Sequence, residues 1–127
     1  NEENPVKYIR FSVKQYSGAV DAKVEVLRKR SRLVKSDPPG KVYRHMNIWV
    51  VAEGLFDSSK MDAPVVGFMV SNLWLEENST DGSAITLFRY ANDVWHELPT
   101  EKVGEDDGNL IFEAKTPGFS SFAICVV

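Results

Sequence analysis

The chain has 127 residues, of which 43% are hydrophobic, and 15 basic against 18 acidic side chains give it a net charge of −3. This composition predicts a folded protein, and the length fits one domain that needs no disulfide or metal to hold its core. The small acidic excess argues against nucleic acid as the main partner, because phosphate binding is driven by cationic charge.

The two ends of the chain have distinct compositions. Residues 1–5 are polar and end in Pro5, which predicts a linker before a single domain over residues 6–127. The only cysteine, Cys125, lies in the apolar run of residues 122–127, where we expect a buried and unreactive thiol. No run of about 18 apolar residues occurs, so we expect no membrane insertion by this segment.

Alternating apolar residues predict two strands near the start of the chain, at residues 8–13 and 22–27. The inward-facing side chains would be Ile9, Phe11 and Val13 in the first strand, and Val24 and Val26 in the second.

A basic run follows these strands, with five cationic side chains among residues 28–35. We expect a solvated loop or a strand edge whose charge prevents aberrant pairing. The alternative is a binding surface for an anionic polymer or an acidic glycan, with Arg28 and Arg30 as candidate contacts. Residues 38–40, Pro-Pro-Gly, predict a firm break before the next strand.

Residues 42–51 form the longest predicted strand, with Met46, Ile48 and Val50 on one face. The opposite face would carry Tyr43, His45, Asn47 and Trp49. A neighbouring segment could cover that face, or it could stay partly open as a contact surface, and the sequence leaves both alternatives open.

The second half of the chain predicts more strands and one short helix. Residues 65–70 have strand character, and Ser71 would cap a two-turn helix to Asn78 that needs packing by Trp74. Further strands are expected at residues 85–90, 94–98, 110–114 and 122–127, with turns at residues 91–93, 104–108 and 116–118. About eight short strands and one short helix predict an all-β fold, an antiparallel β-sandwich.

Two clusters of residue types could carry chemistry. His45 and His96 have no partner at metal-ligand or catalytic spacing, so we expect neither a catalytic site nor a cofactor. The acidic residues 105–107 lack the spacing of a calcium loop and predict an exposed hairpin turn. A calcium site gathered from separate loops, using Asp81 or Asp93, stays open, and Asp106 and Asp107 are candidate ligand contacts.

Two further features concern sugars. Asn78-Ser79-Thr80 is the only glycosylation sequon, and Asn78 is a candidate acceptor in a polar loop. Trp49, Trp74 and Trp95 could form an aromatic platform for a glycan, although tryptophans in a domain of this size more often pack in the core. Trp49 is the candidate contact among them.

The order of several short motifs resembles the PGF-pre-PGF domain of archaeal surface proteins. The motifs lie at residues 95–100 (Trp-His-Glu-Leu-Pro-Thr), 104–107 (Gly-Glu-Asp-Asp) and 116–124 (Thr-Pro-Gly-Phe-Ser-Ser-Phe-Ala-Ile), with further matches at residues 24–27, 38–43 and 74–78. The resemblance covers the chain from about Val6 to Val127.

This resemblance implies a non-catalytic structural or assembly module of an archaeal extracellular surface protein, close to a C-terminal anchor. Its partners would be neighbouring domains of the same protein, together with surface-layer (S-layer) proteins or glycans. The alternative function is a carbohydrate- or calcium-binding adhesion module.

Overall fold

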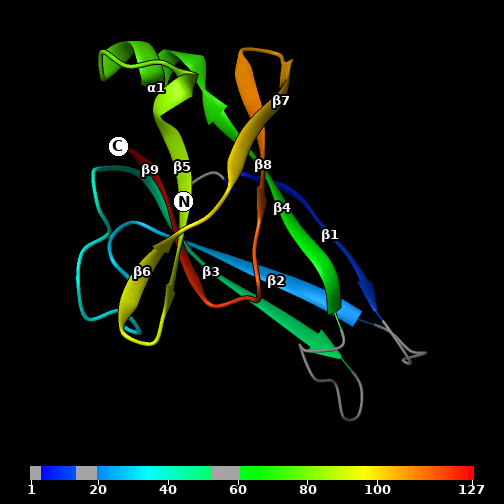
Figure 1. Ribbon diagram of the computed structural model, residues 1–127. Helices are drawn as coiled ribbons and strands as arrows, with labels where there is room; N and C mark the ends of the chain where they lie inside the picture. Colours follow the sequence, from blue (N-terminus) through cyan, green and yellow to red (C-terminus); the bar gives the residue numbers. More distant parts are fainter. Residues whose placement is uncertain (1–3, 14–19, 53–60) are drawn as a thin grey trace.

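The computed structural model describes residues 4–13, 20–52 and 61–127, and Figure 1 shows that their strands form two layers. The described part contains nine strands: β1 (Val6–Val13), β2 (Val20–Leu27), β3 (Lys41–Ala52), β4 (Met61–Ser71), β5 (Ile85–Ala91), β6 (Val94–Glu97), β7 (Thr100–Asp106), β8 (Asn109–Lys115) and β9 (Ser121–Val126). One short helix, α1 (Asn72–Glu77), and a 3-10 turn at Gly82–Ala84 connect β4 to β5.

All strand pairs in the two sheets are antiparallel. Sheet A has the order β1-β4-β8-β7, and sheet B has the order β2-β3-β9-β5-β6. The predicted all-β, antiparallel sandwich is therefore confirmed. No helix in the described residues is long and apolar enough to cross a bilayer.

The core lies between the sheets because each central strand turns alternate large side chains inward. Phe68 on β4 and Phe112 on β8 stack with ring centroids 5.5 Å apart, and both are almost fully buried. Their partners from sheet B include Met46, Ile48, Leu87, Phe122 and Ile124. Fully burying one such side chain stabilises the fold by about 2 kcal/mol relative to leaving it exposed.

The first residues of the described chain are tied to sheet A. Residues 1–3 of the predicted linker lie outside the described residues, as do the side chains of Phe11 and Val13. Pro5 is buried, and its carbonyl oxygen accepts a hydrogen bond of 2.8 Å from the backbone N–H of Met69. The division into a linker and one domain stays a prediction.

Two hairpins turn as the sequence predicts. Asn92 and Asp93 join β5 to β6 with φ angles of 54° and 63°, and Asp107 and Gly108 join β7 to β8 with 46° and 82°. Positive φ at both central residues matches the right-handed twist of a hairpin. The second turn is shorter than the predicted residues 104–108, since Glu105 and Asp106 belong to β7.

The sequence predicts about eight strands, whereas the described residues form nine, and β7 is the additional one. It is an edge strand, and most of its side chains, including Val103, are exposed. A strand without a buried face has no alternation of apolar and polar residues to reveal it.

One face assignment in β3 was wrong. Tyr43 was expected beside His45 and Trp49, but it packs against the main core and against Trp74, with ring centroids 4.8 Å apart. The register of β3 on β9 shifts between Val42 and Arg44, and such a bulge reverses the alternation of side chains. The predicted Ser71 cap is confirmed, because its side chain accepts from the N–H of Trp74.

Candidate functional site

A row of polar and aromatic side chains crosses the outer face of sheet B. Strand register places Glu25, Asn47, Ser121, Tyr90 and Trp95 opposite one another in that order. The Asn47 amide donates to Glu25 Oε1 at 3.0 Å, and the Ser121 hydroxyl donates to Asn47 Oδ1 at 2.6 Å. Asn47 is buried, so these bonds fix its orientation and that of the Glu25 carboxylate.

Tyr90 and Trp95, the two aromatic residues of this row, form hydrogen bonds with the loop of residues 28–40. The Tyr90 hydroxyl accepts from the backbone N–H of Lys35 at 3.2 Å, and Trp95 Nε1 donates to the carbonyl of Ser36 at 3.0 Å. The two rings meet edge to face, 5.2 Å apart. Figure 1 shows this loop in cyan beside β6. The basic run is therefore a loop, held at its far end by side chains of sheet B.

A small second core lies on this outer face. Phe88, Ala123 and Cys125 are buried there, with Val42 and Trp95 packed against them. Burial raises the pKa of the Cys125 thiol to about 12, so the thiol is protonated at neutral pH. The prediction of a buried cysteine is confirmed.

A groove of about 520 Å³ lies between the loop of residues 28–40 and strands β2 and β3. We call it the Trp49 groove, and its lining residues are Glu25, Leu27, Arg28, Lys29, Arg30, Ser31, Arg32, Leu33, Asn47 and Trp49. Trp49 is 41% exposed, whereas Trp74 and Trp95 are partly buried against tyrosine rings. Three of the predicted contact residues, Arg28, Arg30 and Trp49, thus come together.

The rim of the Trp49 groove carries unneutralised positive charge. Arg30 lies 3.3 Å from the exposed carboxylate of Asp37. Among the described residues, Arg28, Lys29 and Arg32 have no acidic partner. Such a cluster attracts anions, and the attraction weakens with salt because the groups are exposed.

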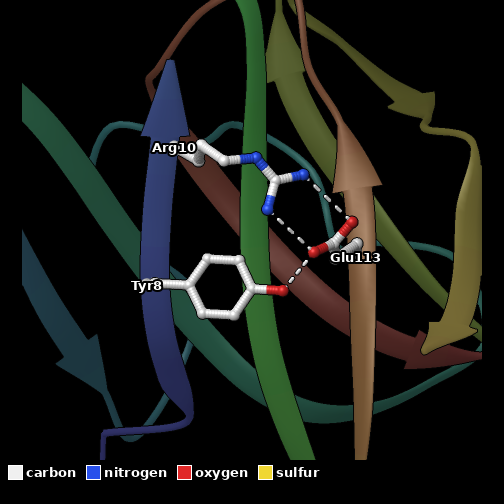
Figure 2. A network of polar contacts seen from close by, with 3 residues as sticks. All are labelled: Tyr8, Arg10 and Glu113. Atoms are coloured by element: carbon white, nitrogen blue, oxygen red, sulfur yellow. Dashed lines mark hydrogen bonds and ion pairs between the residues drawn. The ribbon is translucent and has the colours of Figure 1, made fainter. Parts of the chain in front are cut away.

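A second cluster lies on the outer face of sheet A (Figure 2). Tyr8, Gly67 and Glu113 stand opposite one another on β1, β4 and β8. Because Gly67 has no side chain, the Tyr8 ring lies across it, and its hydroxyl donates to Glu113 Oε2. Arg10 donates to both carboxylate oxygens of Glu113, at 3.1 and 3.3 Å. We call these three side chains the Glu113 clamp.

Electrostatics within the Glu113 clamp favour an ionised carboxylate. Hydrogen bonds from Arg10 and then from Tyr8 hold the pKa of Glu113 below its ordinary value. The same bond to Glu113 raises the pKa of the Tyr8 hydroxyl, which must keep its proton to donate. The clamp connects the edge strand β1 to β8, which lies beyond β4 in sheet A.

The other predicted contacts lie elsewhere. Asp106 forms an ion pair of 3.5 Å with Lys7, and Asp107 sits in the β7–β8 turn, so neither reaches the Trp49 groove. Asn78 caps the end of α1, and its amide nitrogen donates to the carbonyl of Trp74 at 2.7 Å. A glycan on Nδ2 would leave that nitrogen one N–H to donate, and glycosylation of Asn78 stays a prediction.

The histidines and acidic residues are dispersed. A ring nitrogen of His96 lies 3.0 Å from the carbonyl of Ala91. Burial lowers the pKa of His45, which sits on the outer face of β3 opposite Leu27 and Ala123. The described ranges contain no group of three His, Cys, Asp or Glu residues that could hold a metal ion.

Sequence reasoning missed several members of both clusters. Glu25, Leu27 and Leu33 line the Trp49 groove, but only the pairing of β2 with β3 and the path of the loop bring them to Trp49. The Glu113 clamp had one signal, Gly67 inside an apolar strand, since an internal glycine often marks a close approach. Comparison with protein-family models, curated proteins and solved structures found no match.

Proposed function

We propose that this chain is a non-catalytic structural and assembly module of an archaeal extracellular surface protein, close to its C-terminal anchor. Its partners would be neighbouring domains of the same protein and the surface layer around it. The proposal unites the sequence resemblance with the two-sheet fold, and its mechanism is mechanical: a rigid body holds other domains at a fixed distance.

One observation carries this proposal: the residues of the family motif hold the fold together. Trp95 fastens the loop of residues 28–40, and Phe122 lies in the main core. Thr116 is buried, and its hydroxyl donates to the carbonyl of Gly118 at 2.6 Å in the turn before β9. Motif residues with such roles are expected in a module selected for its scaffold rather than for a reaction.

Strand placement suits a module that bears load. Tension at Val127 would reach β9, which is hydrogen-bonded on both sides, to β3 and to β5. Tension at the other end would reach β1, which pairs with β4 alone in the described structure. The Glu113 clamp reinforces that weaker strand by a side-chain connection to β8.

The test is single-molecule force spectroscopy on the chain placed between marker domains. We expect one cooperative rupture, and a lower rupture force in Arg10→Ala than in the wild type. The control is Lys102→Ala, which removes an exposed cation that forms an ion pair with Glu105 on the same strand. Extension without a rupture peak, or equal forces in wild type and Arg10→Ala, would argue against load bearing.

A second function, carbohydrate binding in adhesion, is favoured by one specific observation. Trp49 is an exposed tryptophan beside the hydrogen-bonding side chains of Glu25 and Asn47 in the Trp49 groove. The calcium alternative has no comparable support in the described residues, where Asp93 pairs with Lys35 and Asp81 accepts hydrogen bonds from Ser83.

A further inference from the structure

We infer that the Trp49 groove binds an acidic glycan, an oligosaccharide that carries carboxylate or sulfate groups. The inference rests on the carbohydrate-binding function proposed above and adds the chemical class of the ligand. Three features of the groove match three features of such a sugar: its apolar ring face, its hydroxyl donors and its negative charge.

The apolar feature is the indole ring of Trp49, a residue that is 41% exposed and lines the groove. Lys23 stands opposite it on β2, but the pairing of β3 with β9 ends at Asn47 and Ser121, so no β9 residue pairs with it. Leu27 and Leu33 extend this apolar surface, and Leu33 is 65% exposed. A flat aromatic face next to aliphatic side chains suits the C–H face of a pyranose ring.

The polar feature is the fixed carboxylate of Glu25. Its Oε1 accepts from Asn47, whereas Oε2 accepts no hydrogen bond in the described part of the chain. Carboxylate oxygens accept hydrogen bonds, and Glu25 is exposed, so Oε2 is available to accept from a sugar hydroxyl. A ligand made only of anionic groups would be repelled here.

The charge feature is the rim of Arg28, Lys29 and Arg32. Within the described ranges these cations have no acidic partner, and the loop concentrates positive charge on a protein whose net charge is −3. Guanidinium groups bind carboxylate and sulfate oxygens through paired N–H donors. The rim therefore selects an anionic sugar over a neutral one.

Hydrogen bonds within the protein also hold the loop that lines the groove in place. Tyr90 and Trp95 hold the loop at Lys35 and Ser36, and the backbone N–H of Val34 donates to the carbonyl of Ser31 at 3.1 Å. Val34 and Ser31 are buried beneath the exposed cations. A binding surface that is already ordered loses less conformational entropy on association.

The test is isothermal titration of the full chain with three probes: a short oligogalacturonate, a neutral oligosaccharide of the same length and a poly-glutamate peptide. We expect the oligogalacturonate to bind most tightly, and added salt to weaken it. Trp49→Ala should weaken binding about tenfold, which corresponds to the loss of one aromatic contact, and Trp49→Phe should restore part of it.

A charge-matched pair of triple variants locates the site. Arg28→Gln/Lys29→Gln/Arg32→Gln should abolish the preference for the acidic sugar. Lys7→Gln/Lys102→Gln/Lys115→Gln makes the same charge change on sheet A and should leave it intact. All the altered residues are exposed, so circular dichroism and thermal unfolding should match the wild type.

Each contrary outcome has a distinct meaning. Equal binding of the neutral and acidic sugars would overturn the acidic class and leave carbohydrate binding standing. If neither sugar binds, the acidic-glycan inference and the carbohydrate-binding function are both overturned. The load-bearing proposal is tested separately, by the force measurement. Poly-glutamate that binds as tightly as the sugar, or equal losses in the two triple variants, would replace a glycan site with general attraction of polyanions.

Discussion

Gly67 is the residue on which the Glu113 clamp depends. A Cβ atom there would overlap the Tyr8 ring, which occupies the space above the glycine. Glycine normally weakens a strand, because it packs no side chain and loses more entropy on folding. Here its small size lets Tyr8 reach over β4 to Glu113, and the aromatic ring covers the backbone that the glycine leaves bare.

We therefore expect Gly67→Ala to destabilise the fold by about 2 kcal/mol, the range seen when a close-packed site is overfilled. The measurement is urea unfolding. Gly104→Ala is the matched control, because its Cβ would meet only Ile111 Cδ1 at 3.9 Å.

A double-mutant cycle isolates the contact between the glycine and the ring. In a Tyr8→Ala background the space above residue 67 is vacant, so Gly67→Ala should cost much less there than in the wild type. Equal costs in both backgrounds would show that the ring is not the reason for the glycine.

The ionisation of Glu113 gives a pH dependence. Its pKa is lowered in the folded state, so its contribution to stability is fully present above the ordinary value of 4.5 and is lost as the pH falls through the folded pKa. Urea midpoints measured from neutral pH downwards should fall more steeply in the wild type than in Glu113→Gln.

Glu101→Gln is the control for that experiment. Glu101 stands opposite Glu113 on β7 and makes no ion pair within the described residues, so this variant removes a carboxylate from the same face without breaking the Glu113 clamp. The pKa of Tyr8 is raised, so its contribution is present below its ordinary value of 10.0 and lost as the pH rises through the folded pKa.

At the scale of elements, local chemistry predicted the turns and the central strands. Asn92-Asp93 and Asp107-Gly108 are short turns whose residue types tolerate positive φ, so each hairpin is encoded by two adjacent residues. Strands β4 and β9 were visible as apolar runs because both of their faces are largely covered. Such signals need no knowledge of the rest of the fold.

Elements shaped by distant contacts were not predictable in this way. The bulge in β3 arises from its pairing with β9 and moved Tyr43 to the core, and β7 has no buried face. The same limit applies to the sites. The sequence predicts Arg28 and Trp49 as separate contacts, but their meeting in one groove depends on the loop that Tyr90 and Trp95 hold by hydrogen bonds.

At the scale of the whole molecule, the central and edge strands should differ in local stability. Strands β3, β9 and β5 form the middle of sheet B, and β4 and β8 form that of sheet A. Strands β1, β2, β6 and β7 lie at edges, and most side chains of β6 and β7 are exposed. We expect amide hydrogen exchange to be slowest in the central strands and fastest in β6 and β7. Exchange in β7 as slow as in β9 would contradict this order.

The position of β9 also has a consequence for biosynthesis. It follows its sheet partners in the sequence, yet it joins the β2–β3 pair to the β5–β6 pair. Until the ribosome has made residues 121–126, the other strands of sheet B can pair only as β2 with β3 and β5 with β6. Closure of the sheet then requires contacts between residues as distant as Lys41 and Val126, which is slow compared with hairpin formation. We therefore expect sheet B to assemble as one sheet only after β9 has been synthesised.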